Sequence, residues 1–189
     1  MKRIAIFASG TGTNAENIIR YFQKNDKITV VRVLSNKKDA KVLERAEKLN
    51  ISTLYFNKKE FNEENTVLNV LQKEADFIVL AGFLLKVPDT IVRAFPNKIV
   101  NIHPALLPKY GGKGMYGMHV HEAVKKNGEK ETGITIHYVN EHYDEGTVIF
   151  QKRVAIGPED TPEAIATKVH ELEYEYFPKV IEDIVSRNE

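Results

Sequence analysis

Cysteine and tryptophan are absent from the 189 residues of this chain. Without cysteine there are no disulfides, no thiolate nucleophile and no iron–sulfur or cysteine-ligated zinc site, so His, Asp, Glu, Lys or Asn must carry any chemistry. An excess of one charge sign is also lacking, because 27 Lys and Arg residues stand against 26 Asp and Glu residues. The resulting net charge of +1 does not favour binding to a nucleic-acid backbone or an anionic membrane. We expect small-molecule substrates as partners, with no nucleic acid and no membrane.

Long hydrophobic runs are missing as well. The longest extends from Phe77 to Leu85 and is roughly half of the ~20 apolar residues that a membrane-spanning helix needs. Ile4 to Ala8 follow Met1-Lys2-Arg3 as in a secretory signal, but this apolar core is too short and no cleavage pattern follows it. These features predict a cytoplasmic protein with a single domain over residues 1–189. A monomer or a weak homodimer is expected.

Runs of β-branched and aromatic residues alternate with helical patterns over the first hundred residues. Because a strand, a helix and a following parallel strand connect with a right-handed crossover, this alternation predicts an α/β fold with a doubly wound, mostly parallel sheet and helices on both faces. Ligands of such sheets bind at the carboxyl ends of the strands. The expected strands are Ile4 to Ala8, Thr29 to Leu34, Ser52 to Phe56, Phe77 to Leu80 and Ile99 to Ile102, and the expected helices are Asn14 to Lys24, Ala40 to Leu49 and about Glu63 to Lys73.

The pattern changes after His103. Pro104 to Met118 hold four glycines and two prolines, which predicts a long loop of the kind that usually serves a site. An antiparallel extension of the sheet and a long final helix follow, and Pro178 is expected to kink or divide that helix. The predicted elements are a helix at His119 to Lys126, strands at Gly133 to Val139 and Val148 to Ile156, and a helix that starts at the capping sequence Asp160-Thr161-Pro162-Glu163.

A glycine-rich turn, Ser9-Gly10-Thr11-Gly12-Thr13-Asn14, lies between the first strand and the first helix. Glycines allow an anion to approach the backbone closely, and free N–H groups at the helix start would bind it, which indicates a phosphate-binding turn. Two alternatives stay open at this point. The residues could merely cap the helix, or they could bind a dinucleotide, although Ser35-Asn36-Lys37-Lys38 lacks the acidic residue that an NAD site needs.

Asn101 and His103 lie at the end of the fifth strand, where alternation places both side chains on one face. A side-chain amide beside an imidazole can stabilise an oxyanion, and the imidazole can also transfer a proton near neutral pH. A carboxylate such as Asp144 brought against His103 would stabilise the imidazolium and raise its pKa. The plainer alternatives are that His103 caps a turn and that Asp144 is a turn residue.

Two other chemistries find little support. His119 and His121 are two apart on a helix and point to different faces, so no metal site is expected. None of the four serines lies in the G-x-S-x-G pattern of serine hydrolases.

Four motifs occur in order along the chain: S-G-T-G-T-N at 9–14, L-A-G-F-L at 80–84, N-I-H-P-A-L-L-P at 101–108, and T-G-I-T-I-H-Y-V at 132–139, followed by Asp144. Together they resemble the glycinamide ribonucleotide formyltransferase family of purine biosynthesis, over essentially the whole chain. The resemblance implies a Rossmann-like formyltransferase fold that transfers a formyl group from the co-substrate 10-formyltetrahydrofolate to the amine of phosphoribosylglycinamide, without a metal.

The resemblance also implies which residues act. It assigns catalysis to Asn101, His103 and Asp144, with a phosphate-binding half at about 1–100 and a catalytic and folate-binding half at about 101–189. The residues implied to bind phosphoribosylglycinamide are Thr11, Gly12, Thr13, Asn14 and Glu173, and those implied to bind 10-formyltetrahydrofolate are Leu84, Leu85, Lys86, Val87, Asn101, Tyr138, Val139 and Asn140. Compared with better-known members, Leu85 stands where Arg is frequent, and the loop from Gly111 to Met118 is longer.

The implied chemistry is direct acyl transfer, in which Asn101 and protonated His103 stabilise a tetrahedral oxyanion and Asp144 stabilises the imidazolium. Another folate-dependent formyltransferase, such as methionyl-tRNA formyltransferase, or a formyltetrahydrofolate hydrolase is an alternative, but each normally carries a further domain that 189 residues do not accommodate. Outside the enzyme class, the alternative is a catalytically silent module that binds a phosphorylated metabolite.

Overall fold

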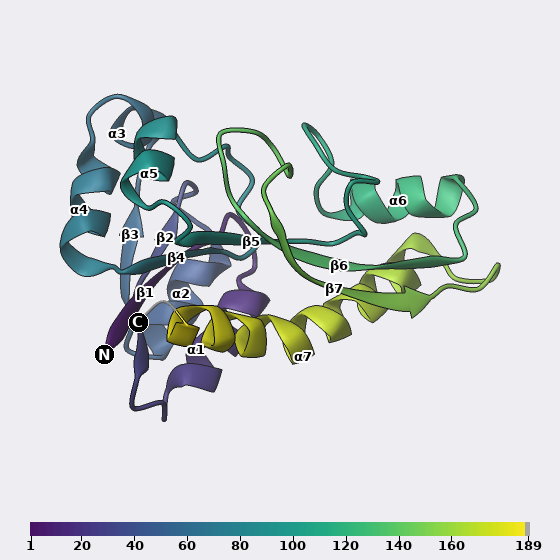
Figure 1. The fold of residues 1–189 in the computed structure, drawn as a ribbon, viewed down its shortest axis with the longest axis horizontal. Coiled ribbons are helices and arrows are strands. Elements are labelled where there is room, and N and C mark those ends of the chain that lie inside the picture. Colours follow the sequence, from purple (N-terminus) through teal and green to yellow (C-terminus); the bar gives the residue numbers. More distant parts are fainter. Residues whose placement is uncertain (188–189) are drawn as a thin grey trace.

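The structure, a computed structural model, describes residues 1–187. Its centre is one sheet of seven strands in the order β3-β2-β1-β4-β5-β6-β7 (Figure 1). The strands are β1 (Lys2–Phe7), β2 (Ile28–Ser35), β3 (Ser52–Tyr55), β4 (Phe77–Leu80), β5 (Ile99–His103), β6 (Glu131–Tyr138) and β7 (Val148–Ala155).

The sheet is parallel from β3 to β5 and antiparallel from β5 to β7, so both the doubly wound sheet and its antiparallel extension are confirmed. From β1 the chain builds outward on one side through β2 and β3, then returns to place β4 on the other side of β1. The loops that follow β1 and β4 therefore diverge in opposite directions and leave a crevice at the carboxyl edge of the sheet.

Helices cover both faces of the sheet, as the sequence predicts (Figure 1). One face packs against α1, α2, α6 and α7, which contribute Ile18, Val42, Val120 and Val169 to its core. The other face packs against α3, α4 and α5, which contribute Phe61, Val67 and Ile91. The helices are α1 (Thr13–Phe22), α2 (Lys41–Lys48), α3 (Lys58–Asn62), α4 (Thr66–Glu74), α5 (Asp89–Ala94), α6 (Met118–Lys126) and α7 (Pro162–Arg187).

The segment between β3 and β4 differs from the prediction of one helix at about 63–73. Asn57 starts α3 with a capping box, in which its side chain accepts from the N–H groups of Lys59 and Glu60. Asn65, with a φ of 55°, then breaks the helical path before α4 begins. The short helix α5 also escaped prediction, because six residues are too few to display a 3.6-residue period.

Pro178 lies inside α7, yet the helix runs unbroken from Pro162 to Arg187, so of the two expected effects, a kink or a division, the division does not occur. Proline has no N–H, which leaves the carbonyl of Tyr174, four residues earlier, without its intrahelical donor. The side-chain amide of Asn17 in α1 donates to that carbonyl at 3.0 Å. A neighbouring helix thus supplies the hydrogen bond that the proline removes.

No helix in the described range 1–187 is long and apolar enough to cross a membrane.

The close pairing of β6 and β7 generates a stability prediction. A Cβ at Gly133 would lie 1.9 Å from the carbonyl oxygen of Lys152, which is backbone of β7 and cannot move aside. We expect Gly133→Ala to lower the free energy of unfolding by about 3 kcal/mol or more, because the two strands must separate locally. The matched control is Gly157→Ala, whose Cβ would meet nothing closer than 3.9 Å. Equal midpoints for the two variants in urea unfolding would contradict this account.

Candidate active site

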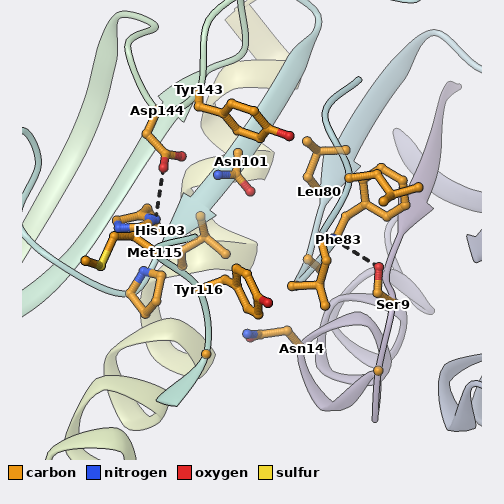
Figure 2. A pocket seen from close by; sticks show the side chains of 18 of the residues that line it. Ser9, Asn14, Leu80, Phe83, Asn101, His103, Met115, Tyr116, Tyr143 and Asp144 are labelled. Carbon is orange, nitrogen blue, oxygen red and sulfur yellow. Dashed lines mark hydrogen bonds and ion pairs between the residues drawn. The ribbon is translucent and has the colours of Figure 1, made fainter. Parts of the chain in front are cut away.

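A cavity of about 740 Å³ opens at the carboxyl edge of the sheet, where the crevice between β1 and β4 is expected (Figure 2). Its walls come from the turn after β1, the segments after β4 and β5, the loop between β6 and β7, and α7. This volume suits a pair of small-molecule substrates rather than one metal ion. It holds the residues that the sequence analysis singles out, with one exception described below.

The turn after β1 leaves its N–H groups free. Gly12 begins α1 with a φ of 75°, and no side chain caps the helix. Among the described residues, the backbone N–H groups of Thr11, Gly12, Thr13 and Asn14 have no hydrogen-bond partner. A Cβ at Gly12 would lie 2.3 Å from Val42, so only glycine lets the turn pass this close to α2. Gly12 is the N-cap residue, but no side chain of the turn satisfies the free N–H groups, so the N-terminus of α1 is open to an anion.

Ser9 was missed as a site residue, yet it joins three loops. It is 1% exposed, its hydroxyl donates to Asn36 at 2.6 Å, and the same oxygen accepts from the N–H of Leu84 at 3.0 Å. The segments after β1, β2 and β4 are thereby fixed relative to one another. The sequence signal was weak, because a lone serine at a strand end has many ordinary uses.

Asn101 and His103 share the cavity-facing side of β5, as alternation predicts. The neighbouring strand adds a residue that the sequence analysis missed, because Asn101 pairs in register with His137 of β6. His137 donates from Nδ1 to the carbonyl of Tyr138 at 2.9 Å, which leaves Nε2 as an acceptor in the neutral ring. The atom of Asn101 that lies 3.1 Å from Nε2 is therefore its NH₂ group. One N–H of that group is bound and the other is free for a ligand.

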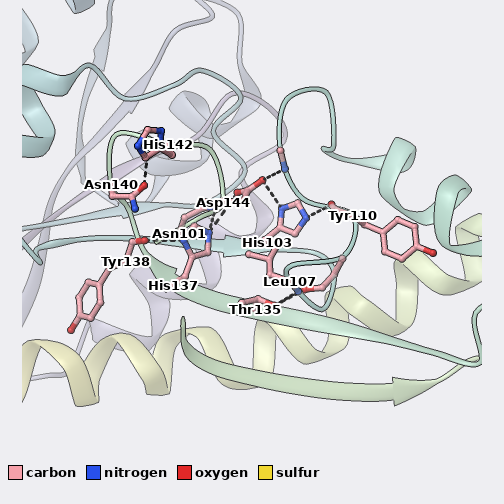
Figure 3. A network of polar contacts seen from close by, with 12 residues as sticks. Asn101, His103, Leu107, Tyr110, Thr135, His137, Tyr138, Asn140, His142 and Asp144 are labelled. Atoms are coloured by element: carbon pink, nitrogen blue, oxygen red, sulfur yellow. Dashed lines mark hydrogen bonds and ion pairs between the residues drawn. The ribbon is translucent and has the colours of Figure 1, made fainter. Parts of the chain in front are cut away.

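The His103 ring is 3% exposed and has an acceptor on each side (Figure 3). Nε2 lies 2.7 Å from the carbonyl oxygen of Tyr110 and donates to it, while Nδ1 lies 3.6 Å from Asp144. Burial lowers the pKa of His103 more than the Asp144 carboxylate and the Tyr110 carbonyl raise it. Asp144 therefore raises the pKa of His103, as expected, but the larger effect of burial leaves that pKa below its ordinary value.

Asp144 stands between two imidazoles (Figure 3). Its carboxylate oxygens lie 3.6 Å from His103 Nδ1 and 3.6 Å from His137 Nε2, and the N–H of Gly112 donates to it at 2.9 Å. Burial raises the pKa of Asp144, but His137, His103 and the Gly112 N–H together lower it further, so the carboxyl is held below its ordinary pKa. The residue is also a turn residue, with a φ of 53°, so the two interpretations of Asp144 are compatible.

Glu173 of α7 faces the turn after β1. It is 5% exposed and accepts from the amide of Asn14 at 2.8 Å and from His170 Nδ1 at 3.3 Å. The hydrogen bond with Glu173 raises the pKa of His170. Asn14 Oδ1 is buried and has no hydrogen-bond partner within residues 1–187. An acidic group and a carbonyl acceptor thus lie next to the open helix N-terminus, where they can accept from hydroxyl or amine groups of a ligand.

The wall expected to bind folate is mainly apolar. Leu84, Leu85, Lys86 and Val87 line the cavity after β4, and Val139 and Asn140 line it after β6. Tyr138 is the exception among the predicted site residues, since its side chain does not line the cavity and packs instead against the core under α7. Alternation along β6 is the reason, because His137 and Val139 face the cavity and the residue between them must face away.

No group of three or more potential metal ligands occurs in the described part of the chain.

Comparison with known proteins places the chain among formyl transferases. The family model described as "Formyl transferase" matches residues 2–181. The phosphoribosylglycinamide formyltransferase of Bacillus subtilis is 37% identical over 194 residues, which is 100% of this chain and 97% of that protein. The chloroplastic enzyme of the same name from Arabidopsis thaliana is 40% identical, over 95% of this chain but 64% of its own length.

Solved structures agree with this result. The phosphoribosylglycinamide formyltransferase of Bacillus halodurans superposes with a TM-score of 0.88 at 38% identity, covering 100% of this chain and 97% of that one. The enzyme of the same name from Anaplasma phagocytophilum gives a TM-score of 0.89 at 31% identity, covering 98% and 88%.

The contact between Asp144 and His103 generates a prediction on pH. Because the carboxylate raises the pKa of His103 against the effect of burial, Asp144→Asn should lower that pKa further. NMR titration of the His103 ring in both proteins measures the change. Glu122→Gln, which removes a carboxylate from the exposed surface of α6, is the control and should leave the titration of His103 in place. An unchanged or raised His103 pKa in the Asp144 variant would refute the pairing.

Proposed function

This chain belongs to the formyl transferase family, and we propose that it transfers the formyl group of 10-formyltetrahydrofolate to the amine of 5'-phosphoribosylglycinamide. The products are 5'-phosphoribosyl-N-formylglycinamide and tetrahydrofolate, and the step belongs to de novo purine biosynthesis. The observation that carries the proposal is that an amide, an imidazole and a carboxylate converge in one cavity beside an open helix N-terminus.

The nucleotide binds, in this proposal, across the end of β1. Its phosphate accepts from the free N–H groups of residues 11–14, where the helix dipole favours negative charge. Glu173 accepts from hydroxyl groups of the ribose, since a carboxylate cannot donate. The half at about 1–100 thus supplies most of the phosphate site, and the half at about 101–189 supplies catalysis, within one domain.

The formyl donor binds along the apolar wall of residues 84–87 and 139–140, which brings its formyl group against β5. The substrate amine attacks the formyl carbon and gives a tetrahedral oxyanion. The free N–H of Asn101 and the Nε2–H of His103 donate to that oxyanion. For His103, the oxyanion competes with the Tyr110 carbonyl, which accepts from Nε2–H in the substrate-free protein.

Protons must then move from the attacking ammonium to the departing folate nitrogen. Burial lowers the pKa of His103, so the ring becomes a strong acid once it is protonated, and Asp144 beside Nδ1 stabilises the imidazolium that forms. A water held by Asp144 would relay the proton, after which the folate nitrogen leaves as the neutral amine. No step needs a covalent intermediate on the protein.

The protein acts on small-molecule substrates in the cytoplasm, as a monomer or a weak homodimer. A related folate-dependent formyltransferase activity, a formyltetrahydrofolate hydrolase, or a silent binder of a phosphorylated metabolite remains the competing function. Incubation with both substrates tests the proposed reaction against these alternatives. If the proposed transfer occurs, formylated nucleotide and tetrahydrofolate must appear together in equal amounts. Formate release without formylated nucleotide would favour the hydrolase, and nucleotide binding without turnover would favour the silent module.

The catalytic assignment predicts the size of three losses. Asn101→Ala, His103→Ala and Asp144→Ala should each lower kcat by roughly 10²- to 10⁴-fold, the range for a positioned proton-transfer group or oxyanion donor. Steady-state formylation rates measure this, with thermal unfolding as a check that each variant is folded. Asn62→Ala, on the exposed surface of α3, should keep the parent rate. Near-parental turnover by His103→Ala would remove the assignment.

A further inference from the structure

The long loop after β5 brings an aromatic residue to the cavity that no part of the proposed mechanism uses. Three glycines shape this loop, because Gly112, Gly114 and Gly117 have φ values of 93°, 87° and 54°. A Cβ at any of the three would meet no atom within 4 Å, so backbone conformation rather than crowding requires glycine there. The loop therefore follows a specific path, and Tyr116 lies on it.

Both sides of Tyr116 are anchored. The N–H of Gly112 donates to Asp144 at 2.9 Å, and Met115 packs against the main core, next to His103 in Figure 2. Beyond the loop, the Tyr116 ring makes an edge contact with the His119 ring of α6, with centroids 5.4 Å apart. Tyr116 is thus directed by its neighbours even though 45% of its surface is exposed.

The hydroxyl of Tyr116 is available for a ligand. It has no hydrogen-bond partner in the described range 1–187, whereas Tyr110 at the base of the same loop is bound to Glu129 and Asn127. Tyr116 lines the cavity, and Figure 2 shows it between His103 and Asn14. Tyr143, in contrast, lies at the top of the view beside Asp144, and Leu80 lies at the right beside Phe83.

We propose that the Tyr116 hydroxyl donates a hydrogen bond to the phosphate of the nucleotide substrate, opposite the N-terminus of α1. The inference rests on the proposed function and adds a recognition residue to it. Glu173 cannot supply this contact, because its carboxylate has no proton to donate and repels the phosphate, whereas a phenolic O–H can donate. The phosphate is then held between backbone N–H groups on one side and a phenolic O–H on the other.

Removing only the oxygen tests the contact. Tyr116→Phe keeps the ring on His119 and should raise KM and Kd for phosphoribosylglycinamide about 10- to 100-fold, the range for a lost hydrogen bond to a charged group. The kcat and the KM for 10-formyltetrahydrofolate should stay within about 2-fold, because the contact is equally strong in the ground and transition states. Tyr55→Phe is the matched control, since Tyr55 is 42% exposed at the end of β3 and lies outside the cavity.

A substrate without the phosphate identifies the group that Tyr116 contacts. With the glycinamide ribonucleoside, the parent and Tyr116→Phe proteins should have equal kcat/KM and equal Kd, so the loss appears only when the phosphate is present. An equal loss on both substrates would overturn the proposal in favour of the ribose or of the loop. An unchanged Kd for the nucleotide in Tyr116→Phe would overturn it outright.

These outcomes are distinct from failure of the proposed function. A parent protein that forms no formylated product would refute the proposed reaction, while the Kd comparison between parent and Tyr116→Phe would still decide the phosphate contact.

Discussion

The site is organised around one partly buried carboxylate. Asp144 lies on the loop between β6 and β7, and it contacts His103 of β5, His137 of β6 and the backbone of the long loop at Gly112. A carboxylate taken out of water is costly unless its charge is compensated, and here the Gly112 N–H donates to it while one imidazole from each of two strands lies 3.6 Å away. Its partial burial therefore couples the positions of those segments, because displacement of any one removes part of what compensates the negative charge.

The two histidines beside this carboxylate, His103 and His137, have different hydrogen-bond partners and therefore different roles. His137 is bound through Nδ1 to its own strand and presents an acceptor that orients the amide of Asn101. His103 has an acceptor on both sides, so it gains most from being protonated, yet burial opposes that protonation. One ring is thus a fixed support, and in the other the attraction of two acceptors opposes the larger effect of burial on its pKa.

Much of this could be predicted from the sequence. The β-branched runs and helical periods predicted the doubly wound, mostly parallel sheet with its antiparallel extension, although not the order of its strands. The shared face of Asn101 and His103 followed from alternation alone. The same rule, applied to β6, would have found His137 and excluded Tyr138, but it needs the register of β5 against β6, which sequence does not supply. Ser9, the tautomers and the net pKa of His103 depend on contacts between distant segments, and these exist only after folding.

Pro178 has a consequence that reaches the substrate site. By freeing the Tyr174 carbonyl, it creates an acceptor on the surface of α7 that the side chain of Asn17 occupies. One turn earlier in α1, Asn14 donates to Glu173, the residue just before Tyr174. These two hydrogen bonds, donated by the side-chain amides of Asn14 and Asn17, therefore fix the axial position of α7 relative to α1. The proline therefore removes one hydrogen bond within α7 and, by doing so, helps to fix the position of α7 along α1.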